Sequence, residues 1–388
     1  MKEATAGTNI IDEKRKRVFL VGIRDDKMSP SEADSLAKEL SSLVETLELE
    51  IVSREMIRIR KNHAKFGMGT GNAQSLADKA ALLKPDCIIF DREISPSQQR
   101  NWEEFTGIPV MDRQELIIQI FASRAKTREA ELQVRLAELV YSLPRLRHKY
   151  VDLSRQRGGR YGTRGSGETR LETDRRLVEK QIEKLEEELE AVKRQRQVQR
   201  RQRERQAIPI CALVGYTNAG KSSIFNALTG AGVLAEDRLF ATLDSTTRRL
   251  MLPSGLQVLL VDTVGFIRRL PHGLIKAFRS TLEEVNRASL ILIILDAADP
   301  DTIAHYETTL SVLAELEAGS IPMITVLNKV DKLESCDTVN NTAGISQKAL
   351  EKLYPESISV SAKNATGLKE LCMRIESTLA SLKLKDCG

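Results

Sequence analysis

The first 120 residues alternate between short apolar runs and segments with helical spacing of apolar positions. The apolar runs predict strands at 18–23, 87–90 and 108–111. The spacing between them predicts helices at 31–47, 97–105 and 114–121. The glycine-rich segment 67–71 lacks the dinucleotide-binding spacing, and we interpret it as a turn or flexible surface loop. This alternation predicts a small α/β domain at 17–120 with a largely parallel sheet, after a flexible N-terminus at 1–16.

Residues 121–206 have the apolar pattern of two helices. Leucines recur every three or four positions from Leu132 to Leu143, which predicts a helix that begins near Lys126 and ends near Pro144. From Leu177 to Val192 the apolar positions follow a heptad-like spacing. Glycine and arginine dominate the segment between the two patterns. We therefore expect an antiparallel helical hairpin whose tip is a loop at 154–170.

Charge changes the interpretation of this hairpin. The chain has a net charge of +5, yet residues 121–206 carry 23 Lys/Arg against 14 Asp/Glu, and each flanking region is slightly acidic. A concentrated positive charge favours a polyanionic partner, because guanidinium groups bind phosphate in bidentate fashion and glycine permits close approach. The tip arginines Arg157, Arg160 and Arg164 are the candidate phosphate contacts. The simpler alternative is a solvated hairpin with charged sides.

A phosphate-binding motif follows an apolar run at 208–214. The sequence GYTNAGKS matches the P-loop pattern GxxxxGK[ST], and a helical pattern comes next. Its residues are Gly215, Tyr216, Thr217, Asn218, Ala219, Gly220, Lys221 and Ser222. Backbone N–H groups at a helix start bind phosphate, a lysine neutralises the β and γ oxygens, and a serine hydroxyl ligates Mg²⁺. We expect Lys221 to be catalytic and Ser222 to be a metal ligand.

Three further motifs follow in order, each at the end of an apolar run. They are DTVG (Asp262, Thr263, Val264, Gly265), NKVD (Asn328, Lys329, Val330, Asp331) and SAK (Ser361, Ala362, Lys363). Asp262 can hold Mg²⁺ through water, and the Gly265 N–H can sense the γ-phosphate and so take part in catalysis. The Asp331 carboxylate can accept from guanine N1–H and N2–H₂, donors that adenine does not present. Four ordered motifs of this kind indicate a P-loop GTPase domain.

The segment between the P-loop and DTVG must supply a threonine that closes on Mg²⁺ and the γ-phosphate. Thr242, Thr246 and Thr247 all qualify chemically, and their spacing does not choose among them. Phe266 stands after DTVG, where many GTPases have a glutamine that orients the attacking water. An apolar side chain cannot orient water, so we expect slow intrinsic hydrolysis that a partner stimulates, unless another side chain positions the water.

Other classes of protein are disfavoured. The chain has no run of eighteen apolar residues and no signal-peptide pattern, so we expect a cytoplasmic protein without a membrane span. Its five cysteines are scattered and lack CxxC spacing, as is typical of incidental thiols.

The motifs together resemble one family. The segments RGG (157–159), GSGET (165–169) and LETDRR (171–176) resemble the signature of the HflX GTPases, as do SPSQQRN (95–101), GYTNAGKS, FATLD (240–244) and the residues from Asp262 to Pro271. The resemblance implies a GTP-binding domain at 207–383 without a separate C-terminal domain. It also implies that Phe240, Ala241, Thr242, Leu243 and Asp244 form the switch segment, with Thr242 as the catalytic, Mg²⁺-binding threonine.

The resemblance further implies a GTPase that binds GTP or GDP with Mg²⁺, and we expect the protein to be a monomer. Its partners would be the large (50S) ribosomal subunit and 23S rRNA, and the tip arginines would contact the rRNA. The GTP-bound form would split or rescue stalled or idle ribosomes. Two alternatives stay open: an RNA-remodelling protein that its GTPase domain regulates, and a GTP/GDP switch for a protein partner.

Overall fold

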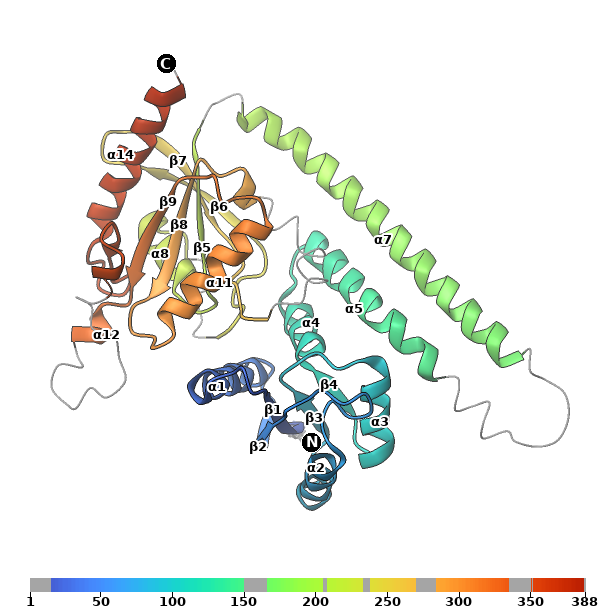
Figure 1. Cartoon of the computed structure of the whole chain (residues 1–388). Helices are drawn as coiled ribbons and strands as arrows, with labels where there is room; N and C mark the ends of the chain where they lie inside the picture. Colours follow the sequence, from blue (N-terminus) through green and yellow to red (C-terminus); the bar gives the residue numbers. More distant parts are fainter. Residues whose placement is uncertain are drawn as a thin grey trace, which may run out of the picture. The chain divides into compact units, whose positions relative to one another are not determined.

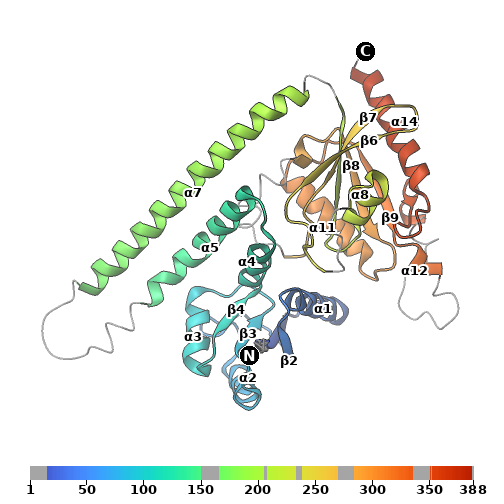
Figure 2. The same ribbon diagram turned by 180° about the vertical axis from the view of Figure 1, so that it is seen from behind.

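The computed structural model describes residues 15–149, 166–204, 208–232, 238–269, 284–334, 350 and 352–386. The chain forms two compact units, Met1–Leu116 and Ile117–Gly388 (Figures 1 and 2). Within the described ranges, no helix is both long enough and apolar enough to cross a bilayer.

The first unit contains a four-stranded parallel sheet with the order β2-β1-β3-β4. Its strands are β1 (Arg17–Arg24), β2 (Glu50–Arg58), β3 (Cys87–Phe90) and β4 (Val110–Asp112). Its helices are α1 (Pro30–Thr46), α2 (Thr70–Leu83) and α3 (Pro96–Thr106), and α4 (Arg113–Arg124) leads into the second unit. The α/β prediction with a parallel sheet is confirmed. Strand β2 and helix α2 were not predicted, and α2 begins inside the segment interpreted as a turn.

Local chemistry explains where two of these helices begin. Ser29 caps α1 by accepting the Glu32 N–H at 3.1 Å, and Ser95 with Gln98 forms a reciprocal capping box at the start of α3. A proline occupies the first turn of both helices, where its missing N–H costs nothing.

The core of the first unit surrounds one tryptophan. Trp102 is fully buried, its Nε1 donates to the Phe66 carbonyl at 3.0 Å, and its ring contacts Phe66 and Phe90 at centroid distances of 5.1 and 5.2 Å. Arg113 is also buried, and its guanidinium pairs with both Asp91 and Glu39. A buried charge of this kind is tolerated only when it is paired.

In the second unit, α5 (Arg128–Lys149) and α7 (Ser166–Glu204) lie side by side (Figures 1 and 2). Arg128 at the start of α5 pairs with Glu188, past the middle of α7, at 2.9 Å, while the end of α5 lies beside the start of α7, so the helices are antiparallel as predicted. The prediction that the first helix ends near Pro144 is wrong, because α5 continues five residues past it. One lost N–H bond does not end a helix that packs along its length on a neighbour.

The predicted tip loop at 154–170 is only partly testable. Residues 166–170 belong to α7, so this part of the loop prediction is wrong. The remaining tip residues, with Arg157, Arg160 and Arg164, lie outside the described residues.

The second sheet has six strands in the order β10-β9-β8-β5-β7-β6, parallel except for β6 against β7. Its strands are β5 (Ile210–Gly215), β6 (Thr246–Met251), β7 (Gln257–Asp262), β8 (Leu290–Asp296), β9 (Met323–Asn328) and β10 (Ile358–Ser359). The buried side chains of β5 alternate between the two faces: Cys211 and Leu213 belong to one core cluster, Ala212 and Val214 to the other.

Helices cover both faces of this sheet, as Figures 1 and 2 show. Among the described residues these helices are α8 (Lys221–Thr229), α11 (Thr302–Glu315), α12 (Asp331–Glu334) and α14 (Leu368–Asp386). Residues of α8 and α14 pack into the cluster that contains Leu213, and residues of α11 pack into the cluster that contains Val214. The predicted P-loop GTPase fold is confirmed, and its loops converge at the carboxyl ends of the parallel strands.

Candidate functional site

A pocket of about 420 Å³ lies at the carboxyl ends of β5, β7 and β9. It is lined by Thr217, Asn218, Gly220, Lys221, Ser222, Ser223, Arg238, Phe240, Ala241, Thr242, Thr263, Gly265, Asn328, Lys329, Asp331, Lys332, Ala362 and Lys363. Fifteen of these residues were predicted from the sequence. Ser223, Arg238 and Lys332 were not, and no motif singles them out.

The P-loop between β5 and α8 needs its glycines. Gly220 has a φ of +90°, and a Cβ there would lie 2.2 Å from the Asn328 Nδ2. Lys221 is 6% exposed, and its Nζ donates to the Tyr216 carbonyl at 2.8 Å and to the Gly215 carbonyl at 3.2 Å. Burial lowers the pKa of Lys221 to about 8, with Lys329 adding to the effect and Asp262 opposing it. The buried ammonium group would be stabilised by an anion in the pocket.

Three oxygen-bearing side chains converge beside Lys221. The Ser222 hydroxyl lies 2.8 Å from the Thr242 hydroxyl and 2.7 Å from Oδ2 of Asp262, and Thr242 lies 3.4 Å from the same carboxylate oxygen. Burial raises the pKa of Asp262. Its second oxygen, Oδ1, is buried without a hydrogen-bond partner. This set of hard oxygen ligands, with one buried acceptor unsatisfied, fits Mg²⁺.

The structure distinguishes the three candidate threonines by position. Only Thr242 has its hydroxyl at this cluster, whereas Thr246 and Thr247 belong to β6. The placement agrees with the role that the family resemblance implies for Thr242.

The DTVG turn packs tightly on the P-loop. A Cβ at Gly265 would lie 2.8 Å from Thr217 Cα and 2.9 Å from Lys221 Nζ, so only glycine allows this approach. The Phe266 backbone bonds to Gly215 and Thr217, at 3.0 and 2.8 Å, while its ring is 1% exposed in the core. A ring buried in this way cannot contact a water molecule in the pocket.

Asn328 joins the loops at the other end of the pocket. It is 1% exposed; its Nδ2 donates to the Ala219 carbonyl at 2.9 Å, and its Oδ1 accepts the Ala362 N–H at 3.2 Å. Asp331 accepts from the Ser361 hydroxyl at 2.6 Å, which orients its carboxylate. Lys329 pairs with Asp296 at 2.7 Å and donates to the Asn218 carbonyl at 2.8 Å. These contacts bring NKVD and SAK together on the P-loop.

The remaining predicted residues lie outside the pocket lining. Five of them contribute backbone or core packing: Gly215, Ala219, Leu243, Val264 and Val330. Asp262 contributes through its hydrogen bonds with Ser222 and Thr242, and Ser361 through its hydrogen bond to Asp331. The Asp244 carboxylate accepts from Lys126 and Thr127 at the start of α5.

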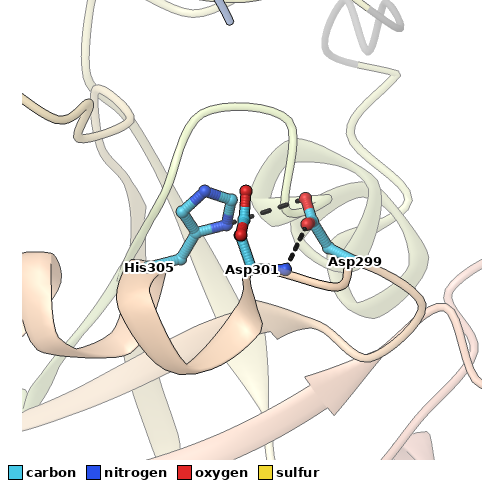
Figure 3. A group of neighbouring side chains, drawn as sticks. All are labelled: Asp299, Asp301 and His305. Carbon is cyan, nitrogen blue, oxygen red and sulfur yellow. Dashed lines mark hydrogen bonds and ion pairs between the residues drawn. The ribbon is translucent and has the colours of Figure 1, made fainter. Parts of the chain in front are cut away.

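Tyr216 belongs to a polar cluster beside the P-loop. Its ring stacks on His305 with centroids 3.7 Å apart, and its hydroxyl accepts the Arg268 N–H at 2.8 Å. Figure 3 shows His305 with Asp299 and Asp301 at the start of α11, where Asp299 accepts the Asp301 N–H at 2.9 Å and lies 3.7 Å from His305 Nδ1. Arg268 lies 3.6 Å from Asp301. Through these contacts the cluster connects the P-loop, the residues after DTVG and α11.

Comparisons with known proteins agree with this geometry. Three family models match the chain: GTP-binding GTPase N-terminal over residues 23–122, GTP-binding GTPase Middle Region over 124–203, and 50S ribosome-binding GTPase over 210–329. The crystal structure of SsGBP in complex with GDP is 25% identical, with a TM-score of 0.50, and covers 95% of this chain and 99% of its own.

Curated relatives match most of the chain. The GTPase HflX of Akkermansia muciniphila is 50% identical over 326 residues, which cover 82% of this chain and 75% of the relative. The GTPase HflX of Alkalihalophilus pseudofirmus is 43% identical, covering 95% and 84%, and that of Escherichia coli is 40% identical, covering 88% and 79%. The pocket, the ordered motifs and these relatives show that the chain belongs to the HflX family of GTPases, whose members bind and hydrolyse GTP.

Proposed function

We propose that this chain binds GTP with Mg²⁺ in the pocket described above and acts, in its GTP-bound form, on the large ribosomal subunit. The observation that carries the nucleotide part is the convergence of Ser222, Thr242 and Asp262 beside the buried Lys221. Ser222 and Thr242 would ligate Mg²⁺ directly, and Asp262 would hold it through water. The metal would neutralise negative charge that develops on the phosphate oxygens.

The residues around the pocket have separate tasks in this proposal. Lys221 exchanges the P-loop carbonyls for β- and γ-phosphate oxygens, and the Gly265 N–H bonds the γ-phosphate. Asp331, oriented by Ser361, accepts from the two donor groups of guanine, and a backbone N–H of the SAK segment meets the guanine O6. A base without those donors would leave a charged acceptor unpaired, which costs about 1–3 kcal/mol or more.

Hydrolysis would be slow without a partner. The buried Phe266 ring leaves the position of the usual water-orienting glutamine without a polar group. A partner that orders the switch segment or contributes a polar group would accelerate the reaction. We propose that the ribosome is that partner, and that the GTP-bound protein splits or rescues stalled ribosomes.

Two features support a ribosomal partner. The family model that matches residues 210–329 is described as a 50S ribosome-binding GTPase. The helical hairpin carries the excess positive charge of the chain, as expected of a surface that binds RNA phosphates. We propose that Arg157, Arg160 and Arg164 contact 23S rRNA, and that the protein works in the cytoplasm as a monomer.

Co-sedimentation with purified ribosomal subunits tests this proposal. The protein would be mixed with each subunit in the presence of a non-hydrolysable GTP analogue, GDP, an ATP analogue or no nucleotide. We expect it to sediment with the large subunit only when the GTP analogue is present. Sedimentation in every nucleotide state would instead favour an RNA-remodelling protein, and none in any state would remove the ribosome as partner.

A pair of triple variants tests the role of the tip. Replacing Arg157, Arg160 and Arg164 by alanine should abolish sedimentation while GTP affinity stays unchanged. The matched control replaces Arg135, Arg175 and Arg176 on the sides of the hairpin helices, of which Arg175 is half-buried and the other two are exposed. Both triple variants remove the same charge. Equal losses in both variants would mean that net charge, and not the tip, drives binding. If the tip variant sediments with the large subunit as the wild type does, a GTP/GDP switch that acts on a protein partner is favoured.

A further inference from the structure

The switch segment at 240–244 contacts both the pocket and the hairpin. Thr242 turns its hydroxyl toward Ser222 and Asp262. Its neighbours two positions away on either side, Phe240 and Asp244, contact the junction between α4 and α5. All of these residues belong to the second unit of the chain. The position of the metal-binding threonine is therefore set from both sides by residues that precede the P-loop by about a hundred positions.

The contact at Asp244 is made by Thr127. The Thr127 hydroxyl donates to Oδ1 of Asp244 at 2.5 Å, and the Lys126 N–H donates to Oδ2 at 3.3 Å. The same hydroxyl accepts the Ala130 N–H at 3.2 Å, which makes Thr127 the cap of α5. Asp244 thus places a negative charge at the positive end of a helix dipole, where it is stabilised. The Thr127 side chain both caps the helix and holds the switch segment.

The contact between Phe240 and Phe121 adds to the one between Asp244 and Thr127. Its ring meets that of Phe121 edge to face, with centroids 4.7 Å apart and planes at 86°. Phe240 is 2% exposed and has a φ of +55°, a conformation that non-glycine residues adopt only when packing holds them. The residue also lines the pocket. Packing on α4 therefore maintains a strained backbone conformation immediately before Ala241 and Thr242.

We propose that Thr127, supported by Phe121, is a positioning residue for GTP hydrolysis that holds Thr242 at the metal site through Asp244. The inference rests on the proposed role of Thr242 as a ligand in the GTP-bound state. GDP lacks the γ-phosphate that Thr242 closes on, so Thr127 should favour the binding of GTP over GDP. By thermodynamic reciprocity, bound GTP stabilises the start of α5, and with it the hairpin, to the same degree.

Thr127→Val tests the proposal, because valine keeps the shape of threonine and removes the hydroxyl. We expect affinity for a non-hydrolysable GTP analogue with Mg²⁺ to fall on the order of tenfold, within the usual range of coupling between sites. Affinity for GDP should change less than about twofold, since GDP makes no use of Thr242. Thr127→Ser keeps the hydroxyl and should restore the preference for the GTP analogue.

Further variants separate positioning from folding. Phe121→Leu keeps an apolar side chain but removes the ring that contacts Phe240, and it should lower GTP-analogue affinity by a smaller factor. The matched control is Thr378→Val, because Thr378 is a half-buried threonine on α14 whose hydroxyl donates to the Arg374 carbonyl; it should change neither affinity. Equal losses of GTP-analogue and GDP affinity in Thr127→Val, or no loss at all, would overturn the proposal. If Mg²⁺ does not change the affinity of the wild-type protein for the GTP analogue, the proposed function is overturned as well.

Discussion

Asn328 connects the phosphate-binding and base-binding parts of the pocket, and its removal gives a testable prediction. In Asn328→Ala, the Ala219 carbonyl and the Ala362 N–H both lose their side-chain partner. An unsatisfied buried polar group costs about 1–3 kcal/mol. With two groups affected and partial compensation by water, we expect a total free-energy cost of about 3 kcal/mol. That cost corresponds to a factor on the order of 100 in an equilibrium constant.

This cost should appear in two measurements. Titration with a fluorescent guanine nucleotide should show weaker binding of both GTP and GDP, because the contact organises the loops and does not depend on the γ-phosphate. Denaturant unfolding without nucleotide should show a loss of about 1–2 kcal/mol in the free energy of unfolding. Competition with unlabelled GTP, XTP and ATP measures the base preference, which should keep its wild-type ratios.

Two results would refute this reasoning. GTP affinity within about twofold of wild type would mean that the two hydrogen bonds contribute little. A changed ratio of GTP to XTP affinity would mean that Asn328 discriminates between bases itself and is more than a connection between loops.

Three further predictions use other positions. Asp331→Asn should weaken GTP binding by about 10²-fold or more and raise the relative affinity for XTP, because the C2 oxygen of xanthine can accept from the new amide. An unchanged ratio of GTP to XTP affinity in the competition assay would contradict the assignment of Asp331. Gly367→Ala should lower the free energy of unfolding by about 2–4 kcal/mol in a denaturant titration, because Gly367 has a φ of +74° and its Cβ would lie 2.2 Å from the Ser359 carbonyl. Gly230→Ala, at a φ of +67° with no atom near the Cβ, is the control and should cost about 1 kcal/mol. Burial raises the pKa of Cys211 to about 12, so this thiol stays protonated below that pH; mass spectrometry should find it unalkylated near pH 8 until the protein unfolds.

The sequence predicts the pocket well because its chemistry is concentrated in short motifs. A P-loop needs glycine, lysine and serine at fixed positions, and each motif follows a strand whose apolar run is easy to recognise. The same reasoning does not give the order of the strands in either sheet. The edge strand β2 was not predicted, because Glu50–Arg58 mixes charged and apolar residues and none of its side chains is fully buried.

Contacts between distant segments are the part that the sequence does not predict. Thr127 and Asp244 are 117 positions apart, and both are common residue types at helix starts and turns. The three candidate threonines of the switch segment are chemically equal, and the contacts of the Thr242 hydroxyl with Ser222 and Asp262 distinguish it in the structure. The Pro144 error has a similar origin, since local propensity was outweighed by packing between α5 and α7.

The single tryptophan of the chain gives the first unit its own optical readout. Trp102 is buried among Phe66 and Phe90 in the first unit, so its emission should report the unfolding of residues 1–116. GDP should stabilise the second unit by mass action, and this unit contains no tryptophan. A thermal melt followed by tryptophan emission, repeated with GDP, therefore measures how strongly the two units are linked. A midpoint that rises with GDP means that they unfold together, and a constant midpoint means that each unfolds independently.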